Sequence, residues 1–261
     1  MPRLNLEKSV EPTVIAQSTE STRLFWIFRT YRMGDTISSQ ISRKTLYLQH
    51  FEQSRYDSTD FSRFKESHMK KIITPDQFKN IPWKNGKGTT TELAISKNGT
   101  LENFDWRISI ASVSEDGEFS DFSGYWRKLI LISGNGIRLV HDENKIDELS
   151  DILSIASFSG NSKTVGKLCD GTIFDFNVMT DMNHFKADIN TYTQECSVEL
   201  NSAEFCFIYS LEKEFHLYET DNFQLEHIDA GSLLRLENIK EKEFVIRGGN
   251  LIVIFLSKLI K

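Results

Sequence analysis

From residue 72 onward, apolar residues occur in short alternating or continuous runs that are separated by turns. This pattern is typical of β-sandwiches and β-barrels, because side chains alternate between the two faces of a strand. In residues 104–113 the alternation is clear, with apolar positions at Phe104, Trp106, Ile108 and Ile110 and polar ones such as Arg107 between them. We therefore predict a strand with one core face and one polar face.

Two further runs, 128–132 and 137–140, flank a Ser-Gly-Asn-Gly segment, which predicts a hairpin because Gly and Asn tolerate the positive φ of a tight turn. Additional strands are predicted at 173–179, 196–200, 205–209, 232–236, 243–246 and 251–256. Ten or more short strands in one chain favour two stacked β-barrel halves, with a division near residue 180. The predicted class is all-β.

The first 68 residues differ from the rest, because they are rich in Ser, Thr, Gln and Arg and show no sustained helix or strand period. We predict a poorly ordered N-terminal extension at 1–68 and a β domain at 69–261, with halves at about 69–180 and 181–261. An equally weighted interpretation is that Met69 is the physiological start and that the upstream segment is an over-extended gene start.

Charge argues against nucleic acid as a partner. The extension holds ten Lys or Arg and eight Asp or Glu, which leaves 21 and 29 for residues 69–261, a net charge of −8. A body this acidic repels phosphates. The apolar runs are far shorter than the roughly 20 residues that span a bilayer. The first residues show no basic segment that leads into an apolar one, so we expect no signal peptide. We expect a cytoplasmic protein with no membrane partner, whose three cysteines are buried thiols.

Four ordered segments resemble the HutD/Ves family. They are Trp83-Lys84-Asn85-Gly86 with Gly88, Thr90 and Glu92; Trp106-Arg107 with Ser109, Ile110 and Ala111; Asp116-Gly117-Glu118-Phe119-Ser120 with Phe122, Gly124, Arg127, Leu129, Leu131, Gly134 and Gly136; and Asp175-Phe176-Asn177 with Met179 and Thr180. The resemblance spans roughly residues 70–255. It implies a double cupin (bicupin) of the RmlC-like cupin superfamily, built from two β-barrel or jelly-roll halves.

The resemblance also carries functional expectations. HutD-like members imply a link to histidine utilisation, with an N-formylglutamate-like or urocanate-like acid as ligand, whereas Ves-like members imply a role in cold and other stress responses. Neither branch implies an established reaction. The chain departs from the family pattern at Thr91, Trp126 and Asp181. Because the family commonly has charged residues there, we expect a site with fewer charges.

Metal-dependent cupins use two histidines separated by one residue, together with a carboxylate and a third histidine. The six histidines of this chain include no such pair: His50, His68, His141, His184, His216 and His227. We therefore expect no metal and no cofactor.

Arg107 is the first candidate for ligand binding, because its planar fork can hold a carboxylate through two hydrogen bonds. An ion pair with Asp105, Glu92 or Asp175 is an equally weighted alternative. For Arg127, which follows Trp126, stacking or strand-edge pairing is favoured over ligand contact, although we keep it in the candidate set.

The remaining candidates add charge or hydrogen bonds. The predicted ligand-binding set is Lys84, Asn85, Thr90, Glu92, Arg107, Arg127 and Asn177. Lys84 and Asn85 belong to a Gly-containing turn that can present backbone amides, and Asn177 is an amide on an otherwise apolar strand.

We thus predict a non-catalytic binder of a small carboxylate metabolite, with a regulatory role in histidine utilisation and no catalytic residue. A Ves-like stress protein, a protein-interaction module and a homodimer stay open. So does a metal-independent cupin enzyme, for which Ser109 or Ser120 would be a nucleophile or Asp116 and Glu118 an acid and base pair, although no GxSxG elbow is present.

Overall fold

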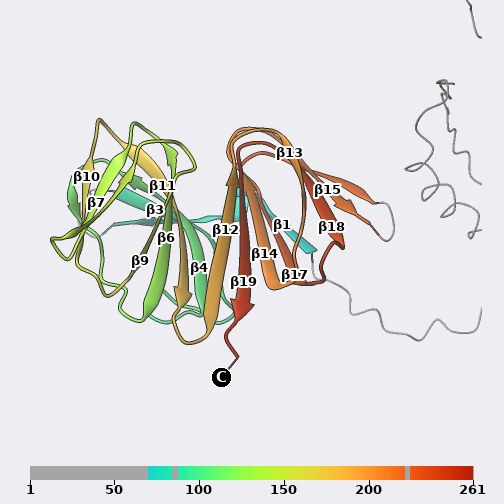
Figure 1. Ribbon diagram of the computed structural model, residues 1–261, viewed down its shortest axis with the longest axis horizontal. Helices are drawn as coiled ribbons and strands as arrows, with labels where there is room; N and C mark the ends of the chain where they lie inside the picture. The colour runs from blue at the N-terminus through green and yellow to red at the C-terminus, as the bar shows by residue number, and fades with distance from the viewer. Residues whose placement is uncertain (1–69, 84–87, 221–223, 261) are drawn as a thin grey trace, which may run out of the picture. The chain divides into compact units, whose positions relative to one another are not determined.

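The computed structural model describes residues 70–83, 88–220 and 224–260. Within these ranges the regular structure consists of β-strands and one short 3-10 helix, Pro75–Gln77. The strands form two stacked barrel halves (Figure 1), which confirms the predicted all-β, two-barrel fold. The predicted extension at 1–68 and the proposed start at Met69 lie outside the described residues.

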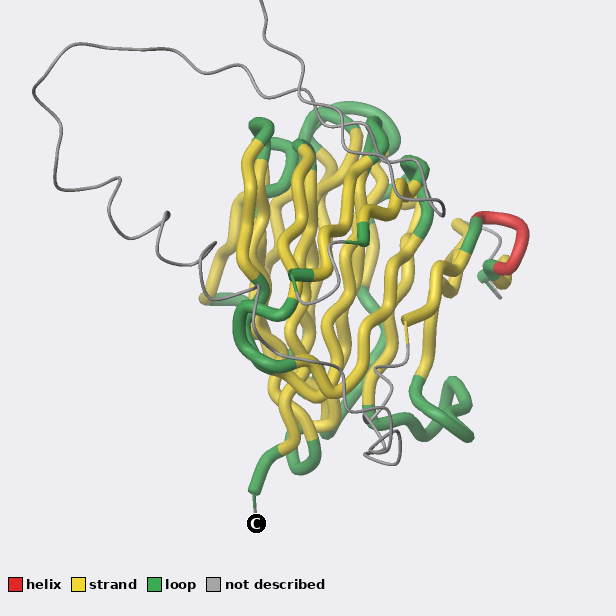
Figure 2. The backbone as a smooth tube through the Cα atoms, turned by 90° about the vertical axis from the view of Figure 1, so that its right-hand side faces the viewer, coloured by secondary structure: helices red, strands yellow, loops and turns green. Residues whose placement is uncertain are grey.

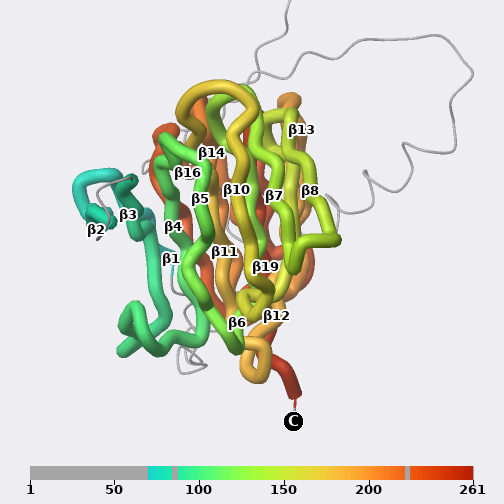
Figure 3. Tube along the Cα trace, turned by 90° about the vertical axis from the view of Figure 1, so that its left-hand side faces the viewer, coloured from blue at the N-terminus to red at the C-terminus, as the bar shows by residue number. Residues whose placement is uncertain are grey.

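The first barrel is made of two antiparallel sheets. The larger has the order β2 (Lys79–Pro82), β3 (Gly88–Ile95), β4 (Trp106–Val113), β11 (Ile173–Asp181), β6 (Tyr125–Ser133) and β9 (Ile155–Ser159). The smaller has the order β5 (Gly117–Glu118), β10 (Thr164–Leu168), β7 (Ile137–His141) and β8 (Lys145–Leu149). Figure 3 faces the smaller sheet and shows its strands side by side in that order.

The second barrel repeats this plan. Its larger sheet has the order β1 (Lys70–Ile73), β17 (Leu233–Ile239), β14 (Ala203–Ser210), β19 (Leu251–Lys258) and β12 (Phe185–Tyr192). Its smaller sheet has the order β13 (Cys196–Glu199), β18 (Phe244–Gly248), β15 (Phe215–Glu219) and β16 (Leu225–Ile228). Figure 2 views the molecule from the side of this barrel. The first described strand, β1, pairs with β17, so the two halves are not strictly consecutive in sequence.

Three hydrophobic clusters hold the domain together. One fills the first barrel, one fills the second, and the third joins the two larger sheets back to back. Trp106 lies in the joining cluster, with its ring centroid 5.0 Å from that of Phe207 and 5.4 Å from that of Phe205. The apolar face of β4 therefore packs against the second barrel, and its polar face points into the first barrel.

The predicted hairpin at 128–140 is wrong. β6 pairs with β11 and β9, whereas β7 pairs with β10 and β8 in the other sheet. Gly134 and Gly136 do have positive φ values, 99° and 117°. They form a corner that carries the chain from one sheet to the other, and a corner requires the same glycines as a hairpin turn.

None of the helical structure in the described ranges is long and apolar enough to cross a membrane.

The three cysteines are free thiols, but only Cys206 is buried, while Cys196 is half-buried and Cys169 is exposed. The expectation of three buried thiols is therefore wrong for Cys169, which lies in the turn after β10.

Candidate functional site

Strand pairing gathers a group of polar side chains inside the first barrel. β11 lies between β4 and β6, and its alternate residues point into the barrel. The interior cluster consists of Glu92, Arg107, Ser109, Arg127, Asp175 and Asn177. In the register, Ser109 is paired with both Glu92 and Asn177, and Met179 is paired with both Arg107 and Arg127.

Arg107 and Glu92 form an ion pair in this cluster. Arg107 is 3% exposed, and its Nε donates a hydrogen bond to Glu92 Oε2 over 2.6 Å. Within the ranges that the structure describes, this is the side-chain hydrogen bond of Arg107, and it uses the Nε–H group of the guanidinium. The ion-pair interpretation of Arg107 is thus confirmed for Glu92, and the fork formed by Nη1 and Nη2 remains available to another acceptor.

Arg127 is buried among aromatic rings. Its guanidinium carbon lies 5.2 Å from the ring centroid of Phe119, 5.4 Å from that of Phe122 and 5.2 Å from that of Phe158. Such rings stabilise a cation through their negative faces. Nη2 donates to Asn177 Oδ1 over 3.4 Å, and Nη1 donates to the Ser120 carbonyl over 3.3 Å.

Buried charge remains incompletely paired around Arg127. Its Nε has no hydrogen-bond partner among the described residues, and burial lowers its pKa to about 10. A buried guanidinium with an unpaired N–H is costly unless an acceptor satisfies it. The sequence favours stacking or strand-edge pairing of Arg127 beside Trp126, whereas the structure places the guanidinium against these three rings and leaves Trp126 exposed on the opposite face.

Asp175 is the fully buried acid of the cluster. Asn177 Nδ2 donates to Asp175 Oδ1, whereas Asp175 Oδ2 has no partner among the described residues. Burial raises the pKa of Asp175 to about 7, and the nearby charge of Arg127 and the hydrogen bond from Asn177 oppose this increase only in part. Asp175 therefore changes charge near neutral pH.

The cluster has a positive balance whenever Asp175 is protonated. Arg107 and Arg127 then carry two positive charges against the single carboxylate of Glu92. Burial strengthens the attraction of such a site for an anion, because little water screens the charges. The arrangement suits a small group with one negative charge and two acceptor oxygens.

Thr90, another predicted site residue, lies on the strand next to this cluster. Thr90 is on β3, and its Oγ1 accepts a hydrogen bond from Trp83 Nε1 over 2.8 Å. Gly88 fits closely here, because a Cβ at this position would lie 2.5 Å from the Ser112 carbonyl. Lys84 and Asn85 lie outside the described residues.

Two of the three departures from the family pattern lie outside the cluster. Thr91 and Trp126 are neighbours of Glu92 and Arg127 along their strands, so their side chains point to the opposite face. Thr91 Oγ1 donates to Asn80 Oδ1, and Trp126 is 47% exposed. These two positions therefore lie outside the cluster, and the expectation of a site with fewer charges stays a prediction that concerns Asp181, at the end of β11.

Among the residues weighed for catalysis, Asp116 has a structural side-chain partner, and Ser120 contacts Arg127 through its backbone carbonyl. Asp116 Oδ1 accepts a hydrogen bond from the Leu168 amide over 2.8 Å, and the Ser120 carbonyl accepts from Arg127. The buried His141 contacts Thr164 and Asp147 through its two ring nitrogens rather than a serine of the cluster.

Sequence reasoning did not place Asp175 or the aromatic cage in the site. In the sequence, Asp175 belongs to a family-like segment and is one alternative ion-pair partner of Arg107, and its spacing of two from Asn177 puts both on one face of a strand. Phe119, Phe122 and Phe158 come from separate segments, and only the folded barrel brings them around Arg127.

Comparison with known proteins identifies relatives over most of the described chain. A family model described as HutD matches residues 75–253. An uncharacterised protein from the hutC 3′ region of Pseudomonas putida is 35% identical over 121 residues, 46% of this chain and 63% of that protein. Protein Ves of Escherichia fergusonii is 36% identical over 108 residues, 41% of this chain and 56% of Ves. The chain thus spans less than two thirds of the length of either relative.

Solved structures agree with this result. HutD from Pseudomonas fluorescens SBW25 is 26% identical, with a TM-score of 0.64 over 74% of this chain and 100% of that one. A conserved protein of unknown function from Pseudomonas aeruginosa PAO1 is 25% identical, with a TM-score of 0.65 over 72% of this chain and 99% of that one. The predicted resemblance to the HutD/Ves family is confirmed.

Proposed function

The chain belongs to the HutD family, and from this premise we propose that the interior of its first barrel binds the carboxylate of a small metabolite without transforming it. The observation that carries the proposal is the pair of buried guanidiniums, Arg107 and Arg127, in a cluster where Asp175 has a pKa of about 7. Two arginines that outnumber the ionised acids favour an anion at this position.

The geometry suits a carboxylate in particular. Glu92 engages the Nε edge of Arg107, so the parallel N–H groups of Nη1 and Nη2 can receive two carboxylate oxygens. Apolar neighbours such as Leu129 and Leu131, both fully buried, line the same interior. A small acid with a short apolar or planar body matches this combination of charge and apolar wall.

The metabolic role proposed here is regulation of histidine utilisation through an N-formylglutamate-like or urocanate-like acid. Support comes from the relative in the hutC 3′ region of Pseudomonas putida and from the solved HutD structure. Protein Ves is about as similar to this chain over its matched part, so sequence similarity does not choose between the two roles. Histidine-degradation genes next to this one would support the regulatory role, and their absence would count against it.

Carboxylates should bind this protein, and their neutral amides should not. We expect formate, acetate, N-formylglutamate and urocanate to raise the melting temperature, because a ligand held at 100 times its Kd stabilises the native state by about 2.7 kcal/mol. Formamide, acetamide and imidazole serve as matched controls without a carboxylate. Equal shifts with acetate and acetamide, or no shift with any acid, would contradict the proposal.

Binding should weaken as the pH rises through about 7. Below this value Asp175 is protonated, and both arginines can attract the anion; above it, ionised Asp175 neutralises one of them. We expect affinity to fall about tenfold between pH 6 and pH 8. In the Asp175→Asn variant the affinity should stay nearly constant over this range. Isothermal titration of both proteins with the acid that gives the largest thermal shift measures the difference, and identical pH profiles would exclude Asp175 as its cause.

A further inference from the structure

Two histidines that are eleven positions apart in the sequence face each other on the second barrel. β15 and β16 pair in antiparallel register, with His216 directly opposite His227. Their ring centroids are 4.4 Å apart, and the ring planes meet at 70°. Phe215 and Leu217, the neighbours of His216, are buried in the core of the second barrel. His216 therefore lies on the outer face of the strand.

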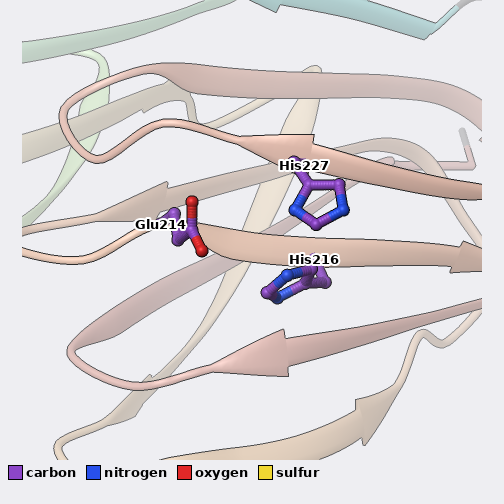
Figure 4. A group of neighbouring side chains, drawn as sticks. All are labelled: Glu214, His216 and His227. Atoms are coloured by element: carbon purple, nitrogen blue, oxygen red, sulfur yellow. The ribbon is translucent and has the colours of Figure 1, made fainter.

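A carboxylate completes this group. Glu214 is two positions before His216 and so belongs to the same face. Figure 4 shows its carboxylate at the start of β15 beside the two imidazole rings. One ligand atom from each of the three residues lies within 4.8 Å of the others.

We propose that Glu214, His216 and His227 bind a divalent transition-metal ion, with Zn²⁺ as the best-matched species. Imidazole nitrogen and carboxylate oxygen are established zinc ligands, and three protein ligands leave the fourth tetrahedral position to water or to an incoming group. This site lies outside the first barrel and is independent of the interior cluster.

The geometry is close to what a zinc ion requires. Zinc bonds of about 2.0–2.2 Å place two tetrahedral donor atoms about 3.4 Å apart, so the three side chains need to move inward only slightly. Glu214 and His227 are exposed and His216 is half-buried, so side-chain rotation can supply this movement. The core packing of Phe215 need not change.

Neighbouring charge does not oppose the ion strongly. Arg247 on β18 is opposite His216 in the strand register. Its Nε, however, lies 3.3 Å from Glu195 Oε1, and this ion pair directs the guanidinium toward the acid. Bound zinc would link β15 to β16 at the edge of the smaller sheet and would stabilise the pairing of these strands.

The proposed site differs from the expectation that the chain binds no metal. That expectation rested on histidine spacing along the sequence, where a metal-dependent cupin has two histidines separated by one residue. The pairing of β15 with β16 brings His216 and His227 together, and the spacing of histidines along the sequence does not reveal such pairing.

Titration of the full chain with zinc chloride tests the site. Calorimetry should give one equivalent that depends on all three ligands. Loss of an outer-sphere hydrogen-bond partner alone weakens metal sites about 10- to 100-fold, so His216→Ala and His227→Ala should each weaken binding at least tenfold, and Glu214→Gln should also weaken it. The matched control is His184→Ala, because His184 is an exposed histidine that pairs with Asp105 instead.

A second readout separates metal binding from loss of the fold. The visible absorption of Co²⁺ bound to the chain should be absent in the His216→Ala and His227→Ala variants, while their melting temperatures without metal stay as in the parent. Zinc should raise the melting temperature of the parent and of His184→Ala only. Binding that both ligand variants retain in full, or no stoichiometric binding by the parent, would overturn the proposal.

Discussion

Replacement of Arg127 by Met is expected to lower the free energy of unfolding by about 3–5 kcal/mol at pH 8, because removal of one partner leaves a buried charge uncompensated. Met preserves much of the apolar contact with Phe119, Phe122 and Phe158 but supplies no charge. Without its nearest cation, Asp175 must at pH 8 either ionise at a greater cost or hold its proton, and both lower the stability of the folded state. Urea unfolding at pH 5 and pH 8 measures the loss.

The stability of the parent protein depends on pH because folding raises the pKa of Asp175. Asp175 has a pKa of about 7 in the folded protein against a reference value of 3.8. Between these values the native state holds the proton that the unfolded chain has released, so stability falls as the pH rises and becomes level above about 7. Without Arg127 the pKa of Asp175 should rise further, and stability should keep falling above pH 7.

A double variant serves as the control for this prediction. Arg127→Met combined with Asp175→Asn removes both charges and should recover most of the stability lost at pH 8, since the two residues are coupled. The single variant should lose less at pH 5, where Asp175 is neutral. An equal loss at both pH values, with no recovery in the double variant, would mean that packing alone explains the role of Arg127.

Replacement of Arg107 by Ala should abolish the thermal stabilisation by carboxylates. Truncation of one partner in a buried charged hydrogen-bond pair costs about 2–5 kcal/mol, which corresponds to at least about 30-fold weaker binding. Isothermal titration with the acid that stabilises the parent most strongly gives the affinity directly. Arg138→Ala is the matched control, because Arg138 is on the exposed surface of β7 and pairs with Glu148.

A second variant covers the case in which Arg107→Ala fails to fold, because that change leaves Glu92 without its partner at 2.6 Å. Arg107→Gln combined with Glu92→Gln removes both charges and keeps two amides that can hydrogen-bond. It should fold and should not bind carboxylates. Parent-like affinity in this variant would exclude the guanidinium of Arg107 as the anion-binding group.

Much of the fold could be predicted from the sequence, because strand alternation is a local property. The alternation around Arg107 correctly separated an apolar face from a polar one. It did not show that both faces are buried, since that depends on the second barrel packing against Trp106. The corner at Gly134 was interpreted as a hairpin because the glycines required by the two structures are the same.

The candidate site could be predicted less completely, because it depends on pairing between strands that are distant in the sequence. Arg107 and Glu92 were named from motifs, and the structure joins them in an ion pair. Asp175 was not placed in the site, since its pKa depends on its burial against β4 and β6. The pairing of His216 with His227 could not be predicted for the same reason, because it also depends on which strands lie next to each other.

The most direct test of anion binding in the first barrel is a crystal structure of the full chain with a stabilising carboxylate bound. We predict that both carboxylate oxygens lie about 2.7–2.9 Å from the Nη atoms of Arg107, inside the barrel and beside Asp175. A structure obtained at a saturating concentration that shows the acid elsewhere, with the N–H groups of Arg107 satisfied by the protein itself, would contradict the proposed function.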